Sequence, residues 1–345
     1  MMLRTFAWSM VATVAGLVLA GLYGGATGVT VTAILIVLEI SLSFDNAVVN
    51  ARVLERMSAS WQRLFLTVGV LIAVIGMRLL FPLVLVGITA HLSPVHAWRL
   101  AMEKGDPDTP GTYGYLLHDA HPAIAAFGGM FLLMIFLSFL LDPDKDLHWL
   151  GPIERVLSKA GALHQVTVLV ALVTLAGFAL RFSEHREQVL LAGVCGLITY
   201  LAVDGLGRLF AVDAVSTVST ASAVLATGRA ALMLFIYLEV LDTSFSFDGV
   251  IGAFAITADP VIIALGLGVG ALYVRSLTMY LVRAGTLDDY VFLEHGAHWA
   301  IGALAVLLML TIGHEIPEIV TGLIGVGFIG AAFAGSLRYN RARAA

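Results

Sequence analysis

An eight-residue motif occurs twice in this chain, each time inside an apolar segment long enough to cross a membrane. The first copy runs from Glu39 to Asn46 (EISLSFDN) and the second from Asp242 to Gly249 (DTSFSFDG), an offset of 203 residues. Both copies keep carboxylates at positions one and seven and serines at positions three and five. A charged side chain at the centre of a bilayer costs about 2.5–3.5 kcal/mol on insertion scales. Two such pairs therefore predict a polar site inside the membrane, because packing alone does not explain them.

The composition is typical of an integral membrane protein, with 59% hydrophobic and 12% charged residues. A spanning helix needs about 20 mostly apolar residues. Ten segments meet this condition, and we predict an all-α polytopic membrane protein with about ten transmembrane helices. The predicted spans are residues 6–23, 29–51, 64–90, 122–141, 164–181, 188–207, 230–257, 260–282, 296–313 and 316–336.

The distribution of basic residues predicts the orientation of these spans. With a cytoplasmic N-terminus, 13 of the 19 Lys and Arg residues fall on the inner side, 4 fall outside, and Arg78 and Arg275 lie within spans. Cytoplasmic loops carry the excess of Lys and Arg, so both termini are predicted to be cytoplasmic, with a basic tail at 338–343. The alternative for the first apolar segment is a signal peptide with Arg4 as its charged region, although no clean A-x-A site follows.

Several function classes are disfavoured by the same sequence. The net charge is −5 and no basic array is present, so a nucleic-acid partner is not expected. Cys195 is the only cysteine, which rules out an intrachain disulfide. We find no positioned nucleophile and base, and we do not expect an enzyme. The oligomeric state is left open.

The two motif copies are predicted to cross the membrane in opposite directions, because four spans separate the two that carry them. A motif repeated in opposite orientation is typical of inverted-topology transporters, whose site lies near the midplane between the halves. We therefore divide the chain into a first membrane half, 1–187, with motif 39–46, and a second, 188–345, with motif 239–249 and the basic tail.

The motif side chains are hard oxygen donors, which suit Mg²⁺, Ca²⁺ or Mn²⁺ better than Zn²⁺ or Cu⁺. Ser43 and Ser246 lie one turn after the first carboxylate of each copy and are predicted accessory donors. The serines, together with Asn46 and Gly249, also favour a local helix break in each copy. The predicted metal ligands are Glu39, Asp45, Asn46, Glu239, Asp242 and Asp248.

Two arginines in the spans that follow the motifs have two interpretations. Arg78 and Arg275 either offset the carboxylate charge when no cation is bound or extend to the nearer membrane interface as anchors. Their position well inside the spans favours charge compensation.

Other polar clusters are weaker candidates. Glu294 is either a further ligand or an interfacial cap. His314, Glu315 and Glu318 are possible accessory cation ligands or a polar hinge; the zincin pattern would need a second His where Glu318 stands. The segment 91–121 is rich in His and acidic residues and is either a cation funnel or a solvated loop, which its prolines and glycines favour.

The pattern L-E-x-S-L-S-x-D-N-A-V at 38–48, with its acidic partner in 239–256, resembles the TerC family of integral membrane proteins. The resemblance implies Mn²⁺ export, and it implies that the acidic motif residues bind the cation. The second motif continues Asp248-Gly-Val-Ile where the family more often has Asp-Ser-Ile-Pro, which indicates a divergent branch. The residues that match are Glu39, Asp45, Asn46, Asp242 and Asp248.

These observations together predict a transporter of a divalent metal cation, with Mn²⁺ favoured and Ca²⁺ or Mg²⁺ as other candidates; the resemblance to the TerC family implies export. The lipid bilayer and the metal ion are the expected partners, and the bacterial inner membrane is the expected location. One alternative is an exporter of a small organic solute such as an amino acid. Another is a cation-stabilised membrane scaffold in metal or tellurite stress response. The sequence leaves the coupling ion and the transport direction open.

Overall fold

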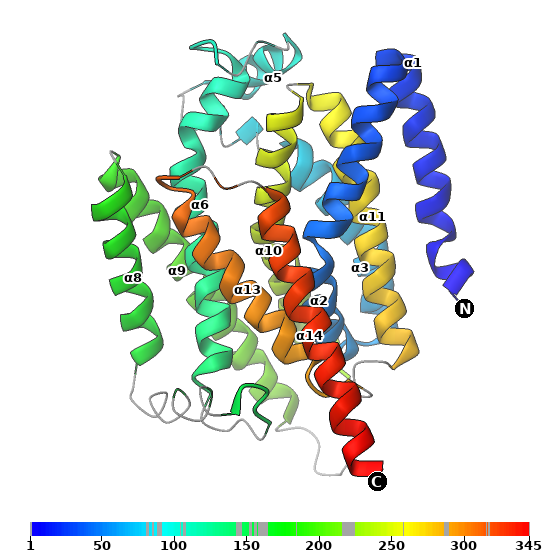
Figure 1. Ribbon diagram of the computed structural model, residues 1–345, viewed down its shortest axis with the longest axis vertical. Coiled ribbons are helices and arrows are strands. Elements are labelled where there is room, and N and C mark those ends of the chain that lie inside the picture. Colours follow the sequence, from blue (N-terminus) through cyan, green and yellow to red (C-terminus); the bar gives the residue numbers. More distant parts are fainter. Residues whose placement is uncertain are drawn as a thin grey trace.

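The computed structural model is a bundle of helices whose axes run mostly along one direction (Figure 1). It describes residues 2–80, 83–84, 86–87, 92–103, 105, 108–142, 147–151, 154, 157, 165–183, 185–215, 225–257, 259–285, 290–314, 316 and 318–344. These residues contain no β-strand, only an isolated bridge between Met57 and Ala226. The predicted all-α class is confirmed.

In the described residues, seven named helical segments lie in the first half of the chain, and five more follow from α9, which begins at the boundary between the halves. They are α1 (Met2–Leu42), α2 (Phe44–Glu55), α3 (Ala59–Leu71), the π-helix η1 (Ile72–Leu80), α5 (Pro94–Met102), α6 (Tyr113–Leu140), α8 (Val166–Phe182), α9 (Arg186–Val215), α10 (Gly228–Ile256), α11 (Pro260–Ala284), α13 (Leu293–Leu310) and α14 (Glu318–Ala344).

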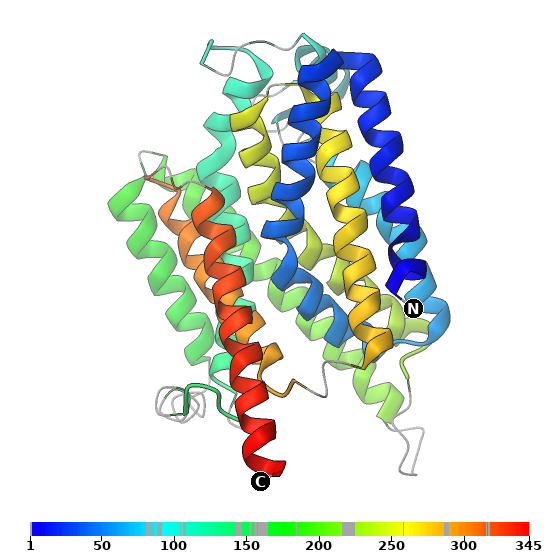
Figure 2. The same cartoon turned by 45° about the vertical axis from the view of Figure 1, so that its right-hand side comes forward.

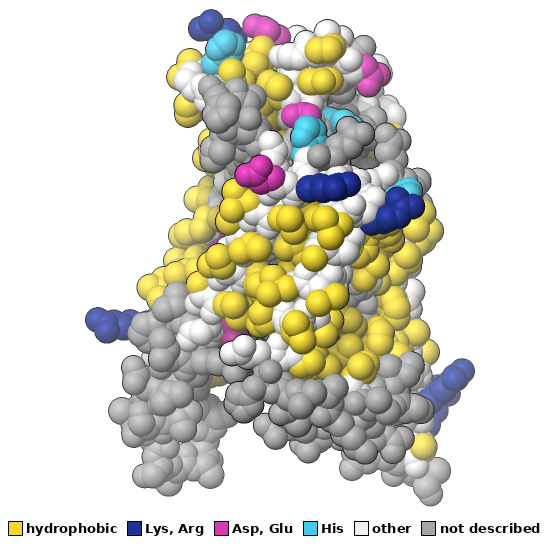
Figure 3. Space-filling model, turned by 90° about the vertical axis from the view of Figure 1, so that its left-hand side faces the viewer, with side chains coloured by type: hydrophobic (Ala, Val, Ile, Leu, Met, Phe, Trp, Pro, Cys, Tyr) yellow, Lys and Arg dark blue, Asp and Glu magenta, His cyan; other side chains and the backbone are white. Residues whose placement is uncertain are grey.

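Six helical segments of the described chain are long and apolar enough to cross a bilayer, as expected of an integral membrane protein. Figure 3 shows a broad apolar band on one face, with charged and His side chains gathered above it. An apolar band of this kind suits a lipid environment. Ten spans in two inverted halves remain a prediction. The six segments are Thr5–Ile40, Ala59–Gly76, Tyr113–Leu140, Arg186–Gly205, Pro260–Ala284 and Leu293–Leu310.

The long helix α1 folds back on itself at Gly25, which has φ 62° and ψ −151°. A Cβ placed on Gly28 would lie 2.5 Å from the carbonyl oxygen of Ala20. Residues eight apart in one straight helix are about 12 Å apart along its axis. The two halves of α1 are therefore antiparallel (Figures 1 and 2), and they match the separate predicted segments 6–23 and 29–51.

Gly25→Ala is expected to destabilise the protein by about 1–3 kcal/mol, because L-residues rarely adopt this backbone conformation. Gly24→Ala is the matched control, since a Cβ there meets only Ile262 Cδ1 at 3.8 Å. Thermal unfolding in detergent measures both variants. Equal melting temperatures for the two would contradict a strained reversal at Gly25.

Two of the predicted spans are not regular α-helices. Ser43 separates α1 from α2 with φ −100° and ψ 15°, so the local break predicted for the first motif copy is present. The break predicted for the second copy is wrong, because α10 continues from Gly228 to Ile256. The predicted span 64–90 changes from α3 to the π-helix η1 at Ile72. Short π-helical segments occur frequently at functional sites.

The segment 91–121 is more helical than the loop we predicted. Ser93 caps α5, which begins with Pro94, and Thr112 Oγ1 accepts a hydrogen bond from the Tyr115 amide at the start of α6. The helix α6 therefore begins nine residues before the predicted start at 122. Such N-caps satisfy otherwise unpaired amides and extend a helix beyond its apolar core.

Two interfaces position the elements that carry the motifs. An apolar core lies between α6, α9 and α13, and both halves of α1 pack on α11. Gly270 of α11 allows a close approach, because a Cβ there would lie 2.5 Å from Glu39 Cβ. The first motif copy is thereby held against α11, and α10 lies on its other side.

Candidate functional site

The two motif copies lie antiparallel and in contact with each other. Asn46, the last residue of the first copy, donates from Nδ2 to Oδ1 of Asp242, the first residue of the second, at 2.7 Å. At the other end, a Cβ on Gly249 would lie 2.7 Å from Glu39 Oε2. The first residue of each copy therefore lies next to the last residue of the other copy, as expected for helices that run in opposite directions.

The first ion pair of the site joins α1 to η1. Arg78 Nη2 donates to Glu39 Oε1, and Ser43 Oγ donates to the same oxygen at 3.2 Å. The other terminal nitrogen, Nη1, donates to the carbonyl oxygen of Ala73 at 2.6 Å. Glu39 is 1% exposed and Arg78 is 5% exposed. Each charge of such a buried pair depends on the other, because removal of one leaves the second without compensation.

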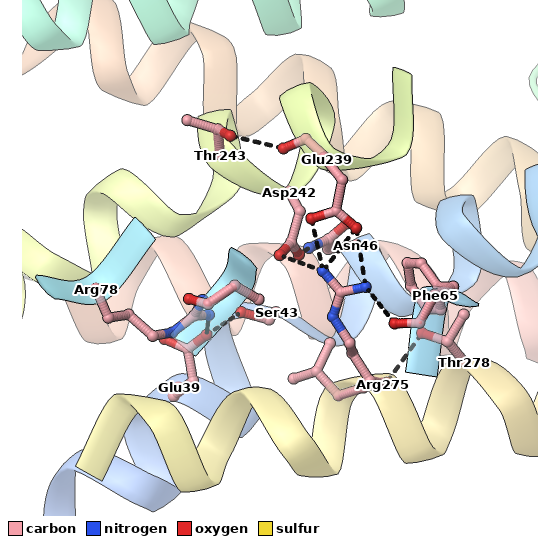
Figure 4. A network of polar contacts seen from close by, with 12 residues as sticks. Glu39, Ser43, Asn46, Phe65, Arg78, Glu239, Asp242, Thr243, Arg275 and Thr278 are labelled. Carbon is pink, nitrogen blue, oxygen red and sulfur yellow. Dashed lines mark hydrogen bonds and ion pairs between the residues drawn. The ribbon is translucent and has the colours of Figure 1, made fainter. Parts of the chain in front are cut away.

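The second arginine, Arg275 of α11, binds two carboxylates of α10 at once (Figure 4). Its Nη2 lies 3.2 Å from Glu239 Oε2 and 3.2 Å from Asp242 Oδ2. Nη1 donates to the Phe65 carbonyl oxygen at 3.1 Å, and the guanidinium carbon lies 4.0 Å from the centre of the Phe65 ring. Carboxylate, carbonyl and ring face together stabilise the buried cation.

Both arginines thus pair with acids inside the bundle, where Arg78 is 5% and Arg275 is 3% exposed. Asn46 links the first copy to Asp242, which Arg275 also binds, so contacts reach from α2 through α10 to α11. The described network holds three carboxylates and two guanidinium groups, a formal charge of −1 when all are ionised. This excess of acid is consistent with a site that attracts a cation.

The predicted ligands divide into two groups. Glu39, Asn46, Glu239 and Asp242 belong to the network. The side chains of Asp45, Ser246 and Asp248 lie outside the described residues. Within the described part of the chain, no three or more His, Cys, Asp or Glu side chains form a group that could hold a metal ion. The described acids are bound to guanidinium groups, so a cation would have to displace these contacts or use the motif aspartates.

Of the predicted accessory residues, Ser43 joins the network through Glu39, whereas Glu294 and His314 lie outside it. Glu294 Oε2 pairs with Arg52 Nε at 3.2 Å and links α13 to α2, with 34% of its side chain exposed. His314 is exposed in the turn after α13, where its ring meets Phe182. Glu315 and the side chain of Glu318 lie outside the described residues. The choice between a further ligand and an interfacial cap for Glu294 stays a prediction.

Sequence reasoning missed Phe65, which supplies a carbonyl oxygen and a ring face to Arg275. No sequence signal marks it, because one phenylalanine among 18 in an apolar chain is unremarkable. It also missed Gly69, where a Cβ would lie 2.6 Å from both Arg275 Nη1 and Glu239 Oε1. Only the packing of α3 against α10 and α11 reveals these roles.

A protein-family model described as "Protein of unknown function (DUF475)" matches residues 44–343. The match begins within the first motif copy and includes Arg78, the whole second copy and Arg275. No curated protein and no solved structure matches the chain.

Proposed function

The chain belongs to the DUF475 family, and from its buried site we propose that it is a membrane transporter of a divalent metal cation, with Mn²⁺ favoured. One observation carries the proposal: a network of acids and arginines, almost fully buried, joins two antiparallel copies of one motif inside an apolar helical bundle. Buried charges at membrane depth mark ion or substrate pathways in membrane proteins.

The chemistry of the donors supports a hard cation as the substrate. Carboxylate and amide oxygens suit Mn²⁺, Mg²⁺ and Ca²⁺, and the resemblance to the TerC family favours Mn²⁺ and export. Sulfur ligands are absent from both motif copies. We place the protein in the bacterial inner membrane, with ten spans in two inverted halves and both termini in the cytoplasm.

The ion pairs suggest how the site avoids repulsion between its acids when no cation is bound. Arg78 and Arg275 act as internal counter-ions for Glu39, Glu239 and Asp242. An entering cation replaces them as the partner of the carboxylates, and the released guanidinium groups favour a second arrangement of the helices. A ligand shifts such an equilibrium only through different affinities for the two states, and this exchange of partners provides the difference.

An exporter of a small organic solute is the second candidate, supported by the same ion pairs. Each arginine lies beside an acid, so an amino acid could place its carboxylate on one guanidinium and its amine on a carboxylate. A cation-stabilised scaffold in metal or tellurite stress response is the remaining candidate, with no transport to measure.

Mn²⁺ uptake into proteoliposomes tests the proposal. We expect saturable uptake by the natural chain and none by Asp45→Asn combined with Asp248→Asn, because two acidic ligands are removed. Glu187→Gln is the matched control: it neutralises an exposed acid at the start of α9 and should transport normally. Competition by Ca²⁺, Mg²⁺ and Zn²⁺ ranks the ions. Absence of uptake by folded protein under several pH gradients would favour the organic solute or the scaffold.

A further inference from the structure

Five buried polar side chains form one row along the second half of α1 and α2. Their sequence spacings of 7, 4, 3 and 4 follow the helical period, so they share one face. At 1.5 Å per residue the row is about 27 Å long, close to the ~30 Å thickness of the hydrocarbon core. The row consists of Thr32, Glu39, Ser43, Asn46 and Asn50, each between 0% and 5% exposed.

The row faces the interior of the bundle. At its Gly25 end, a Cβ on Gly266 of α11 would lie 3.3 Å from the Thr32 carbonyl oxygen. At its centre the row meets α10, through Asn46 and Asp242. The opposite face of α1 is apolar and exposed, with Ile34 48% and Val37 63% exposed. Polar residues inside and apolar residues outside are what a water-lined path through a bilayer requires.

The two end residues of the row differ from Glu39 and Ser43, because each end residue has a buried polar atom without a hydrogen-bond partner. These atoms are Thr32 Oγ1 and Asn50 Oδ1. Elsewhere in the chain, Thr13, Thr174 and Thr278 donate to the carbonyl oxygen four residues earlier.

A buried polar atom left without a partner costs about 1–3 kcal/mol. Hydrogen-bonded polar residues would serve as contacts between membrane helices, but these two atoms make no such contact. Packing contacts therefore do not account for these two atoms.

We propose that the row is one wall of the translocation path. In this proposal Thr32 and Asn50 bind the cation weakly and transiently, one on each side of the acidic centre. This inference rests on the proposed transport function and adds the route. A hydroxyl and an amide oxygen are neutral, hard donors that replace part of the hydration shell of a cation. Weak sites on both sides of a strong one let an ion enter and also leave.

Single cysteines introduced at the two ends test the route. Cys195 is the only natural cysteine, so Cys195→Ser provides a background without thiols. We expect Thr32→Cys and Asn50→Cys, in proteoliposomes, to react with a charged, membrane-impermeant thiosulfonate from opposite sides, and saturating Mn²⁺ to abolish the labelling. Ala51→Cys and Leu35→Cys are the matched controls. Both residues are 0% exposed but neither belongs to the polar row, so both thiols should stay unlabelled.

The outcomes separate the route from the identity of the substrate. No labelling at positions 32 and 50, or equal labelling at Ala51→Cys, would overturn the path. Labelling at both ends that Mn²⁺ leaves unchanged, with no Mn²⁺ uptake, would support the path and reject the cation.

If a cysteine variant does not fold, Thr32→Val and Asn50→Leu provide a second test. Both remove an unsatisfied buried polar atom, so the melting temperature should be unchanged or higher while Mn²⁺ uptake falls. Uptake equal to that of the natural chain would show that the two residues only pack, and would overturn the proposal.

Discussion

Arg275→Met is expected to destabilise the protein by about 3–5 kcal/mol, the usual effect of removing one partner from a buried ion pair. Glu239 and Asp242 would remain buried, 7% and 5% exposed, without the cation that binds both. The Phe65 carbonyl oxygen would also lose the hydrogen bond from the guanidinium group. Thermal or denaturant unfolding in detergent measures the loss.

Neutralising the acids should restore most of that stability. In Arg275→Met with Glu239→Gln and Asp242→Asn, no charge is left unpaired at this position, and an uncompensated buried charge is the main cost of removing one partner. Arg275→Lys should rescue only in part, because one ammonium cannot reproduce the planar fork that binds two carboxylates and a carbonyl. If the triple variant is no more stable than Arg275→Met, the loss does not come from uncompensated charge.

Glu39→Gln is expected to lower stability and to abolish Mn²⁺ uptake, and a second substitution separates these two effects. The single variant leaves Arg78 buried without its carboxylate partner. Adding Arg78→Met removes the unpaired cation, so stability should return, but a carboxylate of the proposed cation site is still missing and uptake should stay absent. Melting temperature and flux, measured on the same preparations, check both expectations.

Glu294→Gln is the matched control for the stability measurement. It breaks the Arg52–Glu294 pair, whose side chains are 21% and 34% exposed. Partly solvated pairs contribute about 0–1 kcal/mol, so the melting temperature should change little.

Recovery of Mn²⁺ uptake in Glu39→Gln with Arg78→Met would show that Glu39 has only a structural role. Glu39 would then not be a ligand of the proposed cation site.

The predicted helix positions agree best where apolar length alone decides them. Segments 230–257 and 260–282 correspond to α10 and α11, which run from Gly228 to Ile256 and from Pro260 to Ala284. A helix is the structure that satisfies every backbone polar group of a single segment within a bilayer. The predicted helix start is wrong where a local hydrogen bond sets it: the Thr112 cap begins α6 before the predicted position.

The sequence by itself determined that polar motifs lie inside an apolar helical protein, because hydrophobicity and motif identity are properties of a local stretch of chain. Only the tertiary structure decided the partners: Arg78 binds Glu39, 39 residues away, whereas Arg275 binds both Glu239 and Asp242 and rests on Phe65, 210 residues away. Such choices depend on the fold of α1 at Gly25 and on the close approach at Gly270. No local sequence pattern encodes these ion pairs, because a buried charge pairs with the oppositely charged group that the fold brings close in space.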